Sequence, residues 1–210
     1  MRRLVIDSAT EACSVALFEY GASEQGEMIA SSHAMLGRGH AEQLVPMIAT
    51  LPGKGRADTI AVNAGPGSFT GIRVGLAAAR ALALAWNVPI EGYACLTLVA
   101  AMARAAHPGA PIDVVMSGGH GEWFFQPFAE DGTALAEPAS LLPQAAVDRA
   151  RAPIVVGSQA EALAARRGGM PVADPMWPDA RAFALLGSYA LRADPTPRYG
   201  RAPDARLPAA

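Results

Sequence analysis

A glycine-rich turn between a buried strand and a long apolar helix constrains the fold of this chain most. The segment "DTIAVNA" has the composition of a buried strand, "GPGSF" that of a turn, and the apolar spacing predicts a helix over Thr70–Trp86. A strand that runs through a tight turn directly into a helix is typical of layered α/β proteins. The turn therefore predicts a sheet with helices packed on its face.

The segments around this unit predict a mixed sheet. "RLVID" and "CSVALFEY" read as a hairpin over Arg3–Phe18, and "MIASSHAM" reads as a third strand. The segment "GHAEQLVPMIATL" predicts a helix, in which Pro46 fits only the first turns. "VPIEGYA" then predicts a strand and "LTLVAAMARAA" a helix. Three opening strands followed by alternating strands and helices indicate an α/β layer whose sheet is antiparallel on one side.

After "HPGAP" the pattern of the opening hairpin begins again, with "IDVVMSGG" and "EWFFQPF". We expect a helix around Gln144–Arg151, the strand "APIVVGS", the helix "QAEALAARR" and a long closing helix over "DARAFALLGSYALRA". This restart predicts two lobes, residues 1–106 with the glycine turn and its helices, and residues 107–210 as a smaller, loop-rich lobe.

The glycine turn is compatible with two roles. It lacks the Lys-Ser/Thr pair of a P-loop, Thr70 stands where a dinucleotide fingerprint has a small residue, and Pro66 lacks an amide. The first amides of the helix could nevertheless bind an anion. A tight turn capped by Ser68 or Thr70 is the alternative. The candidate nucleotide-loop residues are Asp7, Ser8, Gly65, Gly67, Ser68, Thr70 and Gly71.

The helix after the turn carries small residues at every fourth position. Because glycine inside a helix costs about 1 kcal/mol relative to alanine, a close approach of another backbone is expected there. The approaching backbone could belong to this chain or to a second one. The candidate interface residues are Leu44, Met47, Ile48 and Leu51 of the preceding helix and Gly71, Gly75, Ala79 and Ala83 of this one.

The composition and the motifs argue against several other functions. The net charge of −2 gives no electrostatic footprint for wrapping nucleic acid, and neither the two cysteines nor the four histidines have metal-ligand spacing. No serine lies in a nucleophile elbow, and the short apolar N-terminus is not that of a signal peptide. No apolar run is long enough and clean enough to span a membrane. We therefore expect a cytoplasmic protein without a membrane partner.

A second small-residue turn lies at Ser117, Gly118, Gly119 and His120, within "SGGHGEW". It could accept a phosphate or only reverse the chain, and reversal is favoured.

Four segments together resemble a known family. "VIDSATEACSVALF", "GHAEQLVPMI", "GPGSFTGIRVGLAAARALA" and the tail "PRYGRAPDA" resemble the TsaB family over Leu4 to about Ala205. The resemblance implies a two-lobed ribonuclease H-like fold of the actin, Hsp70 and sugar-kinase type. It also implies a non-catalytic relative of TsaD that works with TsaD and the ATPase TsaE. Their product would be N6-threonylcarbamoyladenosine at position 37 of tRNAs that read ANN codons.

The same resemblance argues against a catalytic centre. The two histidines that hold the metal in TsaD correspond here to Cys95 and Val99, which cannot form that site. The resemblance implies that this chain binds no cofactor, that partner subunits hold ATP and metal, and that tRNA is reached only through the complex. The helix pair would contact TsaD, or a second copy when TsaD is absent. The turn at Ser117–His120 departs from the "D-A-R" of TsaB and is similar to the "SGGH" of TsaD.

Two enzyme functions are alternatives. An ATP-dependent phosphotransferase of the same superfamily would use Asp7, Gly65–Gly71 and Ser117–His120. A peptidase would need a metal or a nucleophile that the sequence does not supply.

Overall fold

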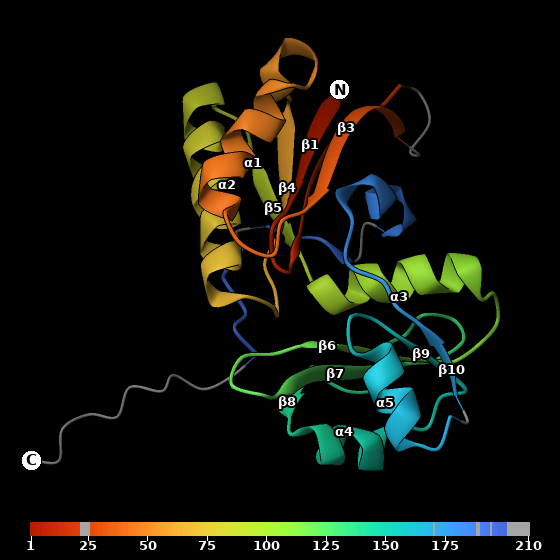
Figure 1. Cartoon of the computed structure of the whole chain (residues 1–210). Helices are drawn as coiled ribbons and strands as arrows, with labels where there is room; N and C mark the ends of the chain where they lie inside the picture. Colours follow the sequence, from red (N-terminus) through yellow and green to blue (C-terminus); the bar gives the residue numbers. More distant parts are fainter. Residues whose placement is uncertain (22–25, 170, 188–189, 194, 201–210) are drawn as a thin grey trace, which may run out of the picture.

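The computed structural model describes residues 1–21, 26–169, 171–187, 190–193 and 195–200. Two mixed β-sheets form two lobes, one above the other in Figure 1, with a helix between them. This is the two-lobed α/β architecture that the sequence predicts.

The first sheet has the predicted mixture of directions. Its strands are β1 (Arg2–Asp7), β2 (Ala12–Glu19), β3 (Glu27–Met35), β4 (Thr59–Asn63), β5 (Ile90–Tyr93) and β11 (Arg192–Ala193). They lie in the order β11-β5-β4-β1-β2-β3. Strands β1, β4 and β5 are parallel, while the β1–β2–β3 side and the β11 edge are antiparallel. The carboxyl ends of β1, β4 and β5 therefore meet at one edge, which is where open α/β sheets bind ligands.

Both faces of the first sheet are covered. Helices α1 (His40–Ala49) and α2 (Phe69–Trp86) pack on one face, against the alternate side chains of β1 and β2 that include Leu4 and Ile6. The short 3-10 helix η1 (Pro52–Gly55) follows α1. Helix α3 (Cys95–Ala106) and the 3-10 helix η2 (Ala180–Leu185) cover the other face. Pro46 is the seventh residue of α1 and lies in its second turn.

The second sheet packs on the far side of α3. Its strands are β6 (Ile112–Ser117), β7 (Trp123–Phe128), β8 (Ala139–Leu141), β9 (Ile154–Val156) and β10 (Val172–Asp174), in the order β10-β9-β6-β7-β8. Helix α3 turns Leu98 toward the first sheet and Leu96 toward the second. Helices α4 (Pro143–Arg149) and α5 (Ala160–Arg166) cover the outer face of the second sheet.

Two features differ from the sequence-based expectation. The predicted long closing helix is wrong, because Ala180–Leu185 forms only a 3-10 helix and Leu186 is extended; residues 188, 189 and 194 lie outside the described residues. The chain also divides less simply than into 1–106 and 107–210, because it returns to the first lobe after β10. There η2 packs on Phe18 and Tyr93, and β11 adds an edge to the first sheet.

Within the described residues, α2 is long and apolar enough to cross a membrane by length and composition alone. It packs along β4, with Ile72, Leu76 and Ala79 turned into the core of the first lobe. A core helix of this length passes the same test, and the place of α2 on the sheet explains its buried stripe, while 33% of the window is buried.

Candidate functional site

The carboxyl ends of β1, β4 and β5 bring three polar side chains together. Asp7 is fully buried and its Oδ2 accepts hydrogen bonds from Asn63 Nδ2 at 2.7 Å and from the Tyr93 hydroxyl at 2.9 Å. Asn63 Oδ1 in turn accepts from the amide of Gly65 at 2.8 Å. The carboxylate that would face a phosphate is therefore closed off, with its hydrogen-bonding capacity used inside the protein.

Burial dominates the electrostatics of this group. Removal from water raises the pKa of Asp7 to about 6, although Asn63, Tyr93 and the amide of Ala9 act in the opposite direction. Burial and the neighbouring Asp7 also raise the pKa of the Tyr93 hydroxyl. Asn63 and Tyr93 were not predicted from the sequence. Their only signal was a polar residue at the end of each of two buried strands.

We expect the stability of the fold to decrease as Asp7 ionises. Its pKa is about 6 in the folded protein against an ordinary value of 3.8, so between these values the folded state keeps a proton that the unfolded chain has released. The contribution of Asp7 to the free energy of unfolding then falls by up to about 3 kcal/mol across this window and is constant above it. Urea unfolding across the window measures this fall.

The Asp7→Asn variant isolates that effect, because other carboxyl groups titrate in the same range. The difference in unfolding free energy between the original chain and Asp7→Asn should move in favour of the variant from about pH 4 to about pH 7. A difference that stays constant with pH would contradict the raised pKa.

The glycines of the predicted nucleotide loop are needed for contact with the turn after β1. A Cβ added at Gly67 would collide with the carbonyl oxygen of Ala9, and one at Gly71 with the carbonyl oxygen of Ser8. At Gly75 it would lie 2.5 Å from Ser8 Oγ. The expected close approach of a backbone is thus real, and the backbone belongs to this chain.

Two of the loop amides that an anion would use, those of Ser68 and Gly71, already have partners in this chain. The Ser68 amide donates to Ala9 O at 2.7 Å, and the Ser68 hydroxyl accepts from the Gly71 amide at 3.2 Å as the N-cap of α2. The Ser8 hydroxyl donates to Gly71 O at 2.9 Å. Ser68 is therefore the cap, as one of the two interpretations predicts, while Thr70 is exposed and does not cap α2. The structure supports the tight-turn role of the loop.

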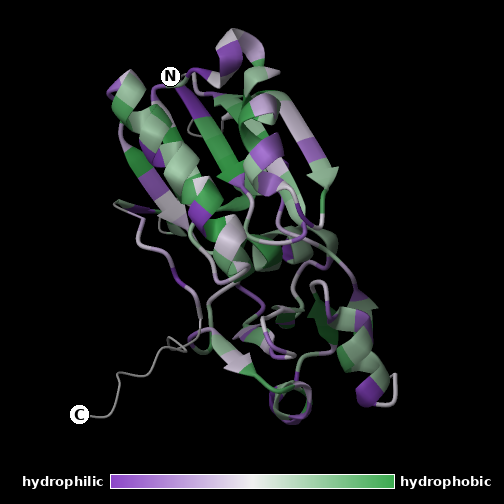
Figure 2. Cartoon of the chain, turned by 60° about the vertical axis from the view of Figure 1, so that its left-hand side comes forward, coloured by the Kyte–Doolittle hydropathy of each residue, from purple (hydrophilic) through white to green (hydrophobic). Residues whose placement is uncertain are grey.

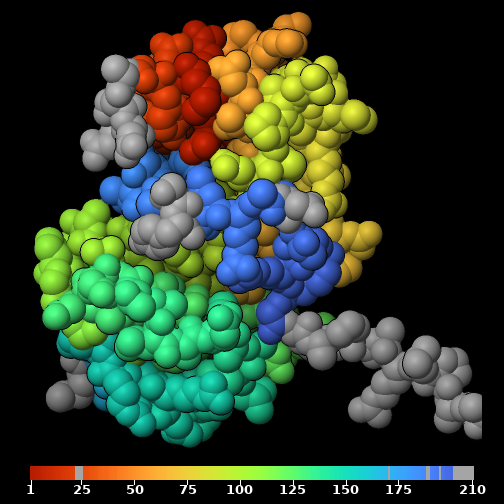
Figure 3. Space-filling model, turned by 180° about the vertical axis from the view of Figure 1, so that it is seen from behind, coloured from red at the N-terminus to blue at the C-terminus, as the bar shows by residue number. Residues whose placement is uncertain are grey.

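A segment near the C-terminus, residues 195–200, lies across the loop, and we call it the C-terminal strap. The Arg198 amide donates to Ala64 O at 2.7 Å, and the Tyr199 ring lies 4.8 Å from that of Phe69. Arg80 Nη2 donates to Pro195 O at 3.0 Å. Figure 3 shows the C-terminal part of the chain crossing the junction between the lobes. The strap further covers the loop; Arg201–Ala205 of the tail motif lie outside the described residues.

The second predicted loop is a hairpin turn. The Gly118 amide donates to Glu122 O at 2.8 Å, and His120 has a left-handed backbone with φ of 60°. The Ser117 hydroxyl accepts from Gln159 Nε2 at 2.8 Å. Chain reversal, the favoured interpretation, is therefore what residues 117–120 accomplish. Among the described hydrogen bonds, none joins this turn to the glycine loop.

The two positions that correspond to the metal histidines are core positions. Cys95 and Val99 are fully buried where α3 packs on the second sheet, and burial raises the pKa of the Cys95 thiol. The described residues contain no group of three or more histidine, cysteine or acidic side chains that could hold a metal ion. This donor set does not fit the metal.

The structure corrects the prediction of the interface residues. All eight are buried within this chain, because the stripes they form on α1 and α2 face the first sheet and each other. They are Leu44, Met47, Ile48, Leu51, Gly71, Gly75, Ala79 and Ala83. They present little or no surface to a second chain in this conformation.

The opposite faces of α1 and α2 are exposed and carry several large apolar side chains among polar ones such as Arg73 and Arg80. Val45 is 57% exposed, Phe69 56% and Leu84 85%. Between them α2 presents Ala77 and Ala81 to solvent. The two helices pack side by side on the sheet, and Figure 2 colours most of α2 as hydrophobic. We call these exposed faces the outer helix surface.

Comparison with known proteins assigns a family to this geometry. The sequence model of the family described as "TsaD: tRNA N6-adenosine threonylcarbamoyltransferase" matches residues 29–187, more than half of the chain. This chain is also similar to proteins named "tRNA threonylcarbamoyladenosine biosynthesis protein TsaB". Identity is 33% over 136 residues with that of Escherichia coli, covering 62% of this chain and 56% of the relative. Identity is 32% over 127 residues with that of Haemophilus influenzae, covering 58% of this chain and 51% of the relative. The match thus spans about half the length of these curated relatives.

A solved structure has the same fold. A Pseudomonas aeruginosa protein described as similar to the peptidase YeaZ superposes with a TM-score of 0.75 at 24% identity, covering 95% of this chain and 99% of that one. The predicted two-lobed fold class is thereby confirmed.

Proposed function

The chain belongs to the TsaB and TsaD family of tRNA threonylcarbamoyladenosine proteins, and we propose that it is a non-catalytic subunit that pairs with a TsaD-type transferase. The observation that carries the non-catalytic role is the closed junction around Asp7. Its carboxylate is buried beneath Asn63 and Tyr93, and the glycine loop packs on the turn after β1. In this conformation the Asp7 side chain is fully buried and presents no surface to a phosphate or a substrate.

We assign the chemistry to the partners. The transferase subunit would hold the metal and carry out transfer to the adenosine at position 37 of ANN-decoding tRNAs, and a TsaE-type ATPase would use ATP. The present chain would contribute binding energy and shape. We also propose that this chain acts in the cytoplasm, where tRNA is modified.

The outer helix surface is the proposed docking site for the transferase subunit. It combines exposed large apolar side chains with small ones, which lets another helix approach closely. The interface therefore uses the same helix pair that the sequence indicates, through the face opposite to the predicted residues. A second copy of this chain could occupy the same surface when the transferase is absent.

The partner proposal is tested by co-purification. The tagged full-length chain is mixed with the TsaD-type and TsaE-type subunits and recovered by affinity and size-exclusion chromatography. We expect the TsaD-type subunit to be recovered with the chain. If it is recovered only at the level of an untagged control, the partner proposal is wrong.

The phosphotransferase alternative makes a different prediction, which calorimetry decides. It requires this chain alone to bind ATP with magnesium through Asp7 and the glycine loop. We expect no heat of binding at millimolar nucleotide, because the Gly65, Ser68 and Gly71 amides already have partners. Saturable binding that Asp7→Asn abolishes would favour the enzyme.

A further inference from the structure

Four arginines lie at or just after the C-terminal ends of α4 and α5, the helices on the outer face of the second sheet. We call Arg149, Arg151, Arg166 and Arg167 the arginine cluster. Helices α4 and α5 pack against each other, and the first three of these side chains are exposed while Arg167 is half-buried. Residues 148–167 contain two acidic residues, Asp148 and Glu161, against four arginines, so the segment is positive in a chain whose net charge is −2.

The protein holds three of these guanidinium groups in place. Arg151 Nη1 donates to Ala150 O at 2.8 Å, and Arg167 Nη1 donates to Ala152 O at 3.1 Å. Arg166 Nη1 donates to the carbonyl of the preceding helical turn at 3.0 Å, and its guanidinium lies 5.1 Å from the Trp123 ring centroid. Each bond uses one nitrogen of a group that carries five N–H donors, so most of the donors are left for a ligand.

No carboxylate of the residues that the structure describes forms an ion pair with the cluster, whereas Arg2, Arg3 and Arg181 each form one. The acidic groups nearby have other partners. Gln144 Nε2 donates to Asp148 Oδ1 at 2.9 Å, and the buried Asp113 accepts from the amides of Arg151 and Ala152. The buried Asp113 and the exposed Asp148 and Glu161 offset part of the charge of the four arginines, which keep a positive excess.

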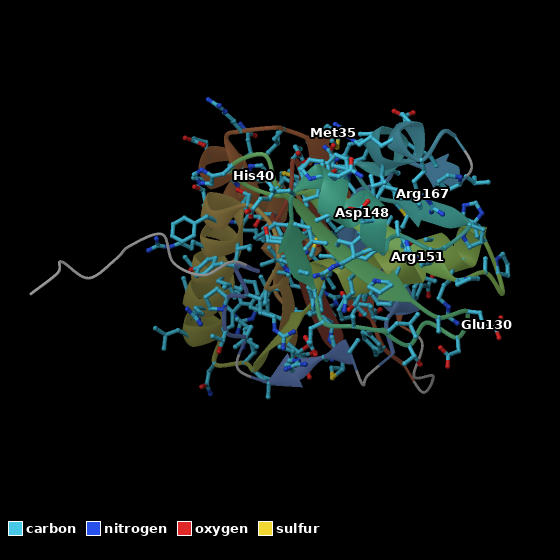
Figure 4. All side chains as sticks on the ribbon, turned by 90° about the horizontal axis from the view of Figure 1, so that it is seen from below. Met35, His40, Glu130, Asp148, Arg151 and Arg167 are labelled. Carbon is cyan, nitrogen blue, oxygen red and sulfur yellow. The ribbon has the colours of Figure 1, made fainter. Side chains whose placement is uncertain are left out.

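We propose that the arginine cluster binds backbone phosphates of the tRNA in the assembled complex. Guanidinium groups fixed by the protein lose little freedom when they bind phosphate, and their forked donors match its oxygens. The inference rests on the proposed function, which supplies the RNA. Figure 1 places α4 and α5 on the lobe away from α1 and α2, so the transferase subunit and the RNA can be held together. Figure 4 shows Asp148, Arg151 and Arg167 on one side of that lobe.

The test compares a variant with three arginine substitutions and a control with two, each in the full chain and assembled with the TsaD-type subunit. One variant carries Arg149→Gln, Arg151→Gln and Arg166→Gln, which leaves the half-buried Arg167 in place. The control carries Arg38→Gln and Arg56→Gln, two exposed arginines of the first lobe. The measurement is the dissociation constant for an unmodified ANN-decoding tRNA as a function of salt concentration.

We expect the cluster variant to weaken tRNA binding by roughly tenfold or more near 0.1 M salt. The slope of log affinity against log salt should fall by about 2 to 3, since each lost phosphate contact removes nearly one unit. The control should change neither quantity. Equal affinities and slopes in an intact complex would overturn this inference and leave the proposed function standing.

Two other results have distinct meanings. If the cluster variant loses the TsaD-type subunit but its remaining complex binds tRNA normally, the cluster docks a protein and the RNA proposal is wrong. If even the original chain fails to assemble with the TsaD-type subunit, both the proposed function and this inference fall.

Discussion

The Ala81→Arg variant is expected to bind the TsaD-type subunit at least about 100-fold more weakly than the original chain. Ala81 is exposed on α2, one turn from Leu84, and belongs to the outer helix surface. Arginine there would place a charge and a long side chain where the proposed contact is close and dry. A loss of about 2.7 kcal/mol, which is a 100-fold change, is ordinary for a disrupted interface centre. Calorimetric titration of the two subunits measures it.

The matched control is Ala105→Arg, the same change at an exposed position of α3. It should leave binding within about twofold, and both variants should unfold in urea like the original chain, since exposed helix substitutions cost little. Equal binding by Ala81→Arg and Ala105→Arg would refute the outer helix surface as the docking site.

The Gly71→Ala variant is expected to lose about 2 to 4 kcal/mol of unfolding free energy. In an unhindered helix, alanine would be favoured over glycine by about 1 kcal/mol. Here the added methyl group would collide with the carbonyl oxygen of Ser8, and two backbones would have to separate. Because neither is a flexible side chain, the steric cost outweighs the helical preference. Urea unfolding of the purified chain measures the difference.

Gly119→Ala is the control for this substitution, since nothing lies within 4 Å of a Cβ at Gly119. Its unfolding free energy should stay within about 0.5 kcal/mol of the original value. If Gly71→Ala instead stabilised the chain, the turn after β1 would not press on α2, and the explanation of the glycine loop would fail.

The local structure around the glycine turn follows from the sequence because the signals there are local. Apolar periodicity defines α2, and Ser68 stands in the N-cap position. The sequence does not determine whether the small-residue stripe faces this chain or a second one. Glycine at positions 71 and 75 indicates a close backbone, but a period of four is the same whether that backbone is Ser8 of this chain or part of another. The structure alone decides between them.

The contacts that close the junction are distant in sequence. Tyr93 reaches Asp7 across 86 residues, and Arg80 reaches Pro195 across 115. No periodic pattern encodes such pairs, so the closed state of Asp7 could not be foreseen. Residues 179–193 show a second reason why the sequence alone does not predict the structure. Helical spacing over residues 179–193 favours a helix, but packing of Phe183 between Phe18 and Tyr93 keeps only the short 3-10 helix η2.

The central claim is that this chain acts by binding a transferase and not by chemistry of its own. Its most direct test is the rate of threonylcarbamoyladenosine formation in a mixture of TsaD-type subunit, TsaE-type ATPase and tRNA, with increasing amounts of this chain. We predict that the rate rises with the original chain and saturates, and that Ala81→Arg requires about 100-fold more protein for the same rate. A full rate without this chain, or equal stimulation by Ala81→Arg, would contradict the account.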